Sequence, residues 1–411
     1  MTRRMPGLLL LLAFAGCASA PAATVATRTP GEAGIASREY VASRVYAEAP
    51  ADAGRRVAAD RGAVTSASSL ASEAGLSILR AGGNAIDGAV ATAFAIGVVE
   101  PQMSGLGGSG AMLIWRQQES SADYLDYYAM QNAPSFRGHT GPHTGDGVDM
   151  RIAGIPGNVA GLLEAHERYG RLTRAQVMAP AIRLAEDGFP VGQVLAQFIL
   201  SDSAKVHRFP ASRAHLYPGG RPLPPGAVLR NPELATTLRI IAERGRAGFY
   251  DGPVGEAVVA ALNAGGHPAT LRELGGYEPV WKRPLCATYR GRVVLSAPPP
   301  QTGGQVLQSL QLLESHDLAA AGLPNRSARA FDILVSALRV AQADNRNGDP
   351  RWNDIPAHGR LSDAFRRQRA ALVGTGGGGG GVGGGGGGEG GGGKKGGGGE
   401  QPTLGGDKRG V

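Results

Sequence analysis

Residues 100–110 read EPQMSGLGGSG, and this glycine-rich stretch decides how the chain folds on either side of it. Residues 105–110 match the pattern G-x-G-x-x-G of dinucleotide-binding loops, in which a strand precedes the glycines and a helix follows. Here the order is reversed. Residues 85–99 are almost all small or apolar, which predicts a buried helix, and residues 111–115 are typical of a strand. No helix N-terminus would face a pyrophosphate, so no cofactor is predicted. We expect the glycines to permit close backbone packing or positive φ angles.

The chain from residue 63 to residue 373 continues with helical and strand-like patterns. Polar residues precede several of the helices: Asn84 precedes 85–99, Thr173 precedes the helix that runs to 187, and Asn231-Pro232 begins the helix to 244. Residues 281–296 alternate like paired strands joined at Arg290-Gly291. Other helices are predicted at 68–80, 159–169, 255–264, 303–315 and 327–343. The pattern predicts a mixed α/β fold.

Composition excludes several classes of protein. The 411 residues contain only two cysteines, which rules out a small disulfide scaffold. The formal charge is +8, but the arginines are scattered among acidic residues and aromatics make up 5%, so no nucleic-acid partner is predicted. His139 and His143 share a loop without the acid and histidine set of a metal-binding helix, so no metal site is predicted. Neither a G-x-S-x-G elbow nor a P-loop occurs.

Residues 1–20 resemble an export signal, with Arg3 and Arg4 before the apolar run 8–15. Residues 14–17 (FAGC) resemble a bacterial lipobox, in which the thiol of Cys17 would carry a lipid; simple cleavage near 18–20 is the alternative. We therefore expect a periplasmic or outer-membrane-anchored protein that meets the membrane only through this anchor. Residues 21–62 are rich in Ala and Pro, which predicts a tether or a loosely docked lead-in.

Residues 374–411 differ sharply from the body, because 24 of these 38 residues are glycine. Such a segment buries too little apolar area to offset its chain entropy, and we expect it to be disordered. Two origins remain open for it: a change of reading frame, or a true flexible Gly-rich linker.

Six segments in fixed order carry a resemblance to a known family. They are residues 63–71 (AVTSASSLA), 78–87 (ILRAGGNAID), 100–108 (EPQMSGLGG), 154–161 (GIPGNVAG), 248–252 (GFYDG) and 297–304 (APPPQTGG). Together they resemble the large subunit of the γ-glutamyltranspeptidase family over residues 63–373. The resemblance implies the large-subunit part of the four-layer αββα sandwich of N-terminal-nucleophile hydrolases. It also implies a small-molecule substrate, a γ-glutamyl or related acyl amide such as glutathione.

In that family the precursor cleaves itself, and the new N-terminal Thr of the small subunit attacks the acyl carbonyl with its own amine as base. Thr375 and Thr403 are the threonines in residues 374–411, and neither begins a Thr-Thr-His or Thr-Ser-His motif. No catalytic residue is therefore assigned, and we expect the chain to be inactive alone unless a small-subunit partner supplies the Thr. A non-catalytic scaffold or binding protein with the large-subunit fold is the alternative.

The acyl pocket also departs from the family pattern. The family places an Arg in a segment like Asp-x-Arg-Glu-x-Ala-Pro, whereas residues 125–134 read LDYYAMQNAP, with Tyr128 where the Arg would stand. An Arg there would pair with a substrate carboxylate through two charge-assisted hydrogen bonds. Tyr128 and Gln131 are the predicted substrate-binding residues, with simple packing as the alternative role, and an acylase with a different acyl donor is an alternative function.

Overall fold

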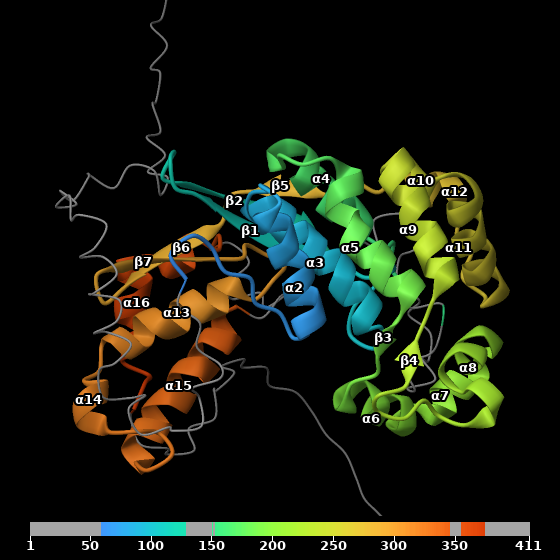
Figure 1. Ribbon diagram of the computed structural model, residues 1–411. Helices are drawn as coiled ribbons and strands as arrows, with labels where there is room; N and C mark the ends of the chain where they lie inside the picture. Colours follow the sequence, from blue (N-terminus) through green and yellow to red (C-terminus); the bar gives the residue numbers. More distant parts are fainter. Residues whose placement is uncertain (1–58, 129–149, 151–152, 346–354, 375–411) are drawn as a thin grey trace, which may run out of the picture.

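The computed structural model describes residues 59–128, 150, 153–345 and 355–374 (Figure 1). The signal region with Cys17, most of the lead-in, the loop with His139 and His143, Gln131 and the tail from residue 375 lie outside the described residues. The strands are β1 (Gly110–Arg116), β2 (Ser121–Tyr127), β3 (Phe189–Pro190), β4 (Val228–Leu229), β5 (Val280–Lys282), β6 (Leu285–Tyr289) and β7 (Arg292–Ser296).

The helices outnumber the strands. They are α2 (Ser69–Arg80), α3 (Ala85–Val99), α4 (Asn158–Tyr169), α5 (Arg174–Asp187), α6 (Gln193–Ser201), α7 (Ser203–Arg208), α8 (Pro210–Leu216), α9 (Pro232–Arg244), α10 (Ala247–Tyr250), α11 (Gly252–Ala264), α12 (Leu271–Gly275), α13 (Gly303–Glu314), α14 (Leu318–Ala321), α15 (Ala328–Asp344) and α16 (Asp363–Ala370). Among the described residues, no helix combines the length and apolar character needed to cross a bilayer.

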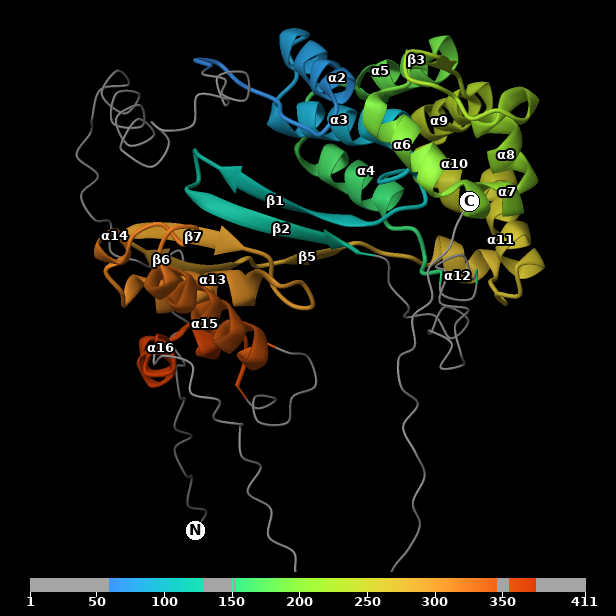
Figure 2. The same ribbon diagram turned by 90° about the horizontal axis from the view of Figure 1, so that it is seen from below.

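The elements stack in four layers, helix on sheet on sheet on helix, as Figure 2 shows. The first sheet has the order β1-β2-β5, and both of its pairings are antiparallel. Helices α3 and α4 lie on one side of it, and the β6–β7 hairpin lies on the other. Helices α13, α15 and α16 cover the outer face of that hairpin. This arrangement confirms the predicted fold class.

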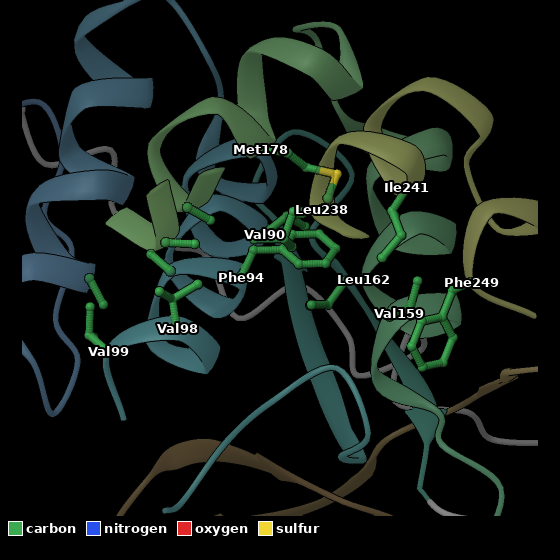
Figure 3. Packing of buried hydrophobic residues seen from close by; sticks show 14 of the residues in the cluster. Val90, Phe94, Val98, Val99, Val159, Leu162, Met178, Leu238, Ile241 and Phe249 are labelled. Carbon is green, nitrogen blue, oxygen red and sulfur yellow. The ribbon is translucent and has the colours of Figure 1, made fainter. Parts of the chain in front are cut away.

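Helix α3 lies at the centre of the larger core. Its sequence AIDGAVATAFAIGVV is apolar on nearly every side, and its middle residues pack against α2 and α5. Phe94 is 2% exposed and its ring lies beside Val90, Leu162 and Leu238 (Figure 3). Asn84 begins the helix by accepting hydrogen bonds from the backbone N–H groups of Ile86 and Asp87. The predicted buried helix and its cap are confirmed.

Most other predicted elements are present with small differences at their ends. The predicted hairpin begins at Leu285, because Trp281 belongs to β5 and pairs with Leu125 of β2. Arg290 and Gly291 both have positive φ, as a two-residue type I′ turn requires. Helices α6, α7 and α8 were not predicted, since each is shorter than ten residues and shows too few turns for a periodic pattern.

The C-terminal helices are held together by a buried ion pair. Asp344, at the end of α15, is fully buried. Arg369 of α16 donates to it from Nε at 2.8 Å and from Nη2 at 2.6 Å, and Gln308 of α13 donates from Nε2 at 2.6 Å. A buried carboxylate is tolerated only when such partners replace its water, so three helices depend on this one group.

Arg369→Met should therefore lower the free energy of unfolding by about 3 kcal/mol, because it leaves the carboxylate of Asp344 buried without its cation. The matched control is Arg366→Met on the same helix, whose pair with Asp363 is solvent-exposed and should cost less than about 1 kcal/mol. Urea unfolding followed by circular dichroism measures both. Equal losses in the two variants would contradict the role given to the buried pair.

Candidate functional site

Segments that are far apart in the sequence meet where β2 ends. Asn158, at the start of α4, donates from Nδ2 to the carbonyl of Gly105 at 2.9 Å. Tyr250 donates from its hydroxyl to the carbonyl of Pro156 at 2.6 Å, and Gln301 donates from Nε2 to Asp126 at 3.4 Å. The glycine-rich stretch, the start of α4, the end of α10 and the segment before α13 therefore come together near the end of β2.

Glycines let α4 approach the end of β2 closely. A Cβ at Gly157 would lie 2.1 Å from the carbonyl oxygen of Tyr127, and one at Gly161 would lie 2.0 Å from its Cγ. A Cβ at Gly110 of β1 would lie 2.7 Å from Cε2 of the same ring. Tyr127 is 6% exposed, so its ring fills the space that three missing side chains leave.

The glycine-rich stretch itself packs closely without unusual backbone angles. Gly97 of α3 would bring a Cβ to 3.2 Å from Cα of Gly105, and the carbonyl of Gly108 accepts the N–H groups of Gly157 and Asn158 at 3.0 Å. None of the glycines at 105–110 is among the described residues with positive φ. The packing explanation is confirmed for Gly108 and Gly110, where a Cβ would crowd Gly105 or Tyr127, and not for Gly105 and Gly107, where it would meet nothing within 4 Å. The positive-φ explanation is wrong for this loop. The loop also follows a helix and precedes a strand, which confirms the reversed order.

Two stacked tyrosines lie beside the start of α4 and support the end of β2. The rings of Tyr250 and Tyr277 lie 6.2 Å apart and nearly parallel, and the hydroxyl of Tyr277 donates to the carbonyl of Tyr128 at 3.1 Å. Burial raises the pKa of both phenols well above the usual tyrosine value, and the nearby Asp126 adds to the rise at Tyr277. Both hydroxyls therefore stay protonated and hold backbone carbonyls in place.

Asp126 is the centre of the polar cluster at this site. Its carboxylate accepts from Nζ of Lys282 at 2.6 Å, from the backbone N–H of Tyr128 at 3.0 Å and from Gln301. Lys282 also donates to the carbonyl of Pro299 at 3.1 Å, and its side chain is 29% exposed. An ammonium has three N–H donors, so one of them has no acceptor among the described residues and can meet a ligand.

Gln301 provides a hydrogen-bond acceptor that complements the N–H donor of Lys282. Its Oε1 atom is buried and has no hydrogen-bond partner within the part of the chain that the structure describes. A buried amide oxygen without a partner costs free energy, so a hydrogen bond from a donor on a ligand would be favourable there. The site thus presents one N–H donor with positive charge and one amide acceptor, which is suited to binding a polar molecule.

Only one of the two predicted substrate-binding residues can be placed. Tyr128 follows β2 directly and its side chain is 55% exposed, while its backbone is held by Asp126 and Tyr277. Gln131 lies outside the described residues. Its assignment and the role of the Tyr128 side chain stay predictions.

Sequence reasoning did not single out Lys282, Gln301 or Tyr277 as site residues. Gln301 and Tyr250 lie inside segments that carried the resemblance, and Lys282 is one of only two lysines in residues 63–373. The scarcity of lysine in this range was the sequence signal that could have singled out Lys282. Within the described ranges, no three His, Cys, Asp or Glu side chains gather closely enough to hold a metal ion.

The comparisons with known proteins agree on one family. A family model described as gamma-glutamyltranspeptidase matches residues 71–377. The glutathione hydrolase proenzyme of Bacillus subtilis (strain 168) is 32% identical, with 76% of this chain and 54% of that protein covered. The acylase ACY 1 proenzyme of Pseudomonas sp. (strain V22) is 34% identical, with 76% and 58% covered. The chain thus spans little more than half the length of these curated relatives.

One solved structure is similar to this protein over nearly the whole length of the solved chain. The Helicobacter pylori gamma-glutamyltranspeptidase has a TM-score of 0.71 and 29% identity, with 77% of this chain and 93% of that chain covered.

The close contact of α4 with Tyr127 can be tested by adding a single methyl group. Gly161→Ala should lower the free energy of unfolding by roughly 2 kcal/mol, because the new Cβ overlaps the Tyr127 ring and one of the two must move. Gly107→Ala is the control, since a Cβ there meets nothing within 4 Å, and its effect should stay within about 0.5 kcal/mol. Urea unfolding checks both; a neutral Gly161→Ala would show that α4 is not held this closely.

Proposed function

Because the chain belongs to the gamma-glutamyltranspeptidase family, we propose that it forms the donor-binding part of an enzyme that transfers an acyl group from an amide to water or to an amine. The first candidate donor is a γ-glutamyl amide such as glutathione. One observation carries the proposal: the segments that resemble the family at residues 100–108, 154–161, 248–252 and 297–304 converge on the end of β2.

The polar groups at this point match the charged end of a glutamyl donor. Its α-carboxylate fits the remaining N–H of Lys282, and its α-ammonium fits the buried Oε1 of Gln301. The ion pair with Asp126 and the hydrogen bond to Pro299 fix the Lys282 ammonium in advance, so little side-chain entropy is lost when the donor binds.

Bond cleavage in this proposal requires a nucleophile from outside residues 59–374. The ammonium of Lys282 is held in an ion pair, and the phenols of Tyr250 and Tyr277 stay protonated because burial raises each pKa. These groups bind and position. The attacking group would be the N-terminal Thr of a small-subunit segment, whose own amine accepts the hydroxyl proton.

The direct test uses L-γ-glutamyl-p-nitroanilide. The purified chain should give no turnover, and turnover should appear when the chain is assembled with a Thr-led small-subunit segment from a family member. In that assembly Lys282→Met should raise KM about tenfold, since it removes a charged hydrogen bond to the donor. Arg80→Met, which removes an exposed cation paired with Glu73, should leave KM unchanged.

Turnover by the chain alone, abolished by substituting one of its described residues, would overturn the assignment of an external nucleophile. An assembly that forms but stays inactive would favour the scaffold alternative over an enzyme. An unchanged KM in Lys282→Met would remove this residue from the donor site.

A second candidate function, an acylase for a donor without an α-carboxylate, is favoured by Tyr128. A tyrosine stands where the resemblance implies an Arg, and one relative is named an acylase. Tyr128 is exposed at the rim beside the Asp126 cluster, where it can contact an apolar acyl chain.

Tyr128→Arg separates the two donors. In the active assembly it should raise kcat/KM for the γ-glutamyl anilide relative to a straight-chain acyl anilide by about tenfold, because the guanidinium adds a pairing group for the α-carboxylate. Tyr128→Phe is the matched control and should change the ratio little. An unchanged ratio in the Arg variant would place this side chain outside the donor pocket.

A further inference from the structure

A cavity lies away from the end of β2, between the α6–α8 helices and the body of the protein. Its volume is about 370 Å³. The end of α3, the residues that follow it, strands β3 and β4 and the start of α9 form the inner wall, and α6, α7 and α8 form the outer wall. In Figure 1 these three helices lie at the lower right, across α3 and α5 from the β6–β7 hairpin.

Hydrogen bonds order each wall of the cavity. β3 pairs with β4, and Val191 and Ala227 extend this pairing by a backbone hydrogen bond of 2.8 Å. The buried hydroxyl of Tyr217 donates to the carbonyl of Ile199 at 2.6 Å, which ties the end of α8 to α6. The cavity is therefore bounded on both sides by hydrogen-bonded structure and is preformed.

The lining is mainly apolar. Phe189, Leu195, Ile199 and Leu229 are buried core residues that also face the cavity, and Phe198 and Leu216 continue the surface. Ligand cavities of a few hundred Å³ with such linings bind small molecules through the burial of apolar area.

One polar atom in this lining lacks a partner. Oε1 of Gln102 is buried, and no described residue donates a hydrogen bond to it. The other polar groups are already satisfied or uncharged. Asp202 and Lys205 pair with each other at 2.7 Å, and Oδ1 of Asn231 accepts from the backbone N–H of Leu234.

His215 completes the polar part of the lining. Burial lowers the pKa of its imidazole, and Glu233 opposes this only in part, so the ring is neutral near pH 7. Across the described lining the cavity carries no uncompensated charge, which disfavours an ionic ligand.

We propose that this cavity binds a neutral small molecule with an aromatic or branched aliphatic body and one O–H or N–H group, which donates to Oε1 of Gln102. The site is separate from the donor site of the proposed function, since Asp126, Lys282 and Gln301 do not line it. Binding of a ligand in this cavity requires neither a nucleophile nor acyl transfer.

The test measures binding of two fluorescent probes to the full chain. 2-Naphthol has an aromatic body and one hydroxyl donor, and 2-methoxynaphthalene has the same ring system without the donor. 2-Naphthol should bind about fivefold more tightly, the factor that one neutral hydrogen bond contributes. In Gln102→Met, which keeps the side-chain length and removes the acceptor, the two affinities should become equal.

A cavity-filling pair of variants locates the site. Leu216→Trp should weaken both probes at least about tenfold by occupying the apolar space. Leu200→Trp, on the exposed side of α6, should leave both affinities unchanged. Thermal unfolding of each variant confirms that it is folded.

Several outcomes would overturn the proposal. These are no binding of either probe at millimolar concentration, equal affinity of the two probes for the original chain, and binding that persists in folded Leu216→Trp. Because the assay contains no acyl donor, its failure would leave the proposed acyl transfer untouched, and an inactive assembly would leave this cavity untouched.

Discussion

The close approach of α4 to the end of β2 is the constraint on which the site depends. Tyr127 occupies the space left by Gly110, Gly157 and Gly161, and no residue with a side chain could stand at the two α4 positions without moving the strand. This contact brings the N–H groups at the start of α4 to the carbonyl of Gly108. The glycine-rich loop, the helix and the strand thus take their positions from one another.

The same constraint explains why Asp126 sits where polar groups can gather. Because Tyr127 points into the glycines, its neighbour Asp126 points to the opposite face of the strand, as the two-residue repeat of a strand requires. That face is where Lys282 of β5 and Gln301 meet the carboxylate. The carboxylate of Asp126 holds these two side chains in place, which leaves an N–H of Lys282 and the buried Oε1 of Gln301 for a ligand.

The fold could be predicted further from the sequence than the site could. Apolar periodicity and capping residues located α3, α5, α9 and the hairpin, since these signals are local. Lys282 and Gln301 carry no such local signal, because their importance comes from strand pairing and a long connection that bring them to Asp126. The short helices α6–α8 could not be predicted from the sequence for another reason. Tertiary packing, not propensity, makes such short segments helical.

One short segment connects the two proposed sites. Residues 101–104 turn back on Glu100 through hydrogen bonds from Met103 and Ser104, so Gln102 faces the α6–α8 cavity only a few residues before Gly105 enters the loop under Asn158. A ligand at Gln102 would therefore contact the turn that precedes the loop. Contiguity alone does not couple two sites, because a ligand shifts only an equilibrium between arrangements that it binds differently.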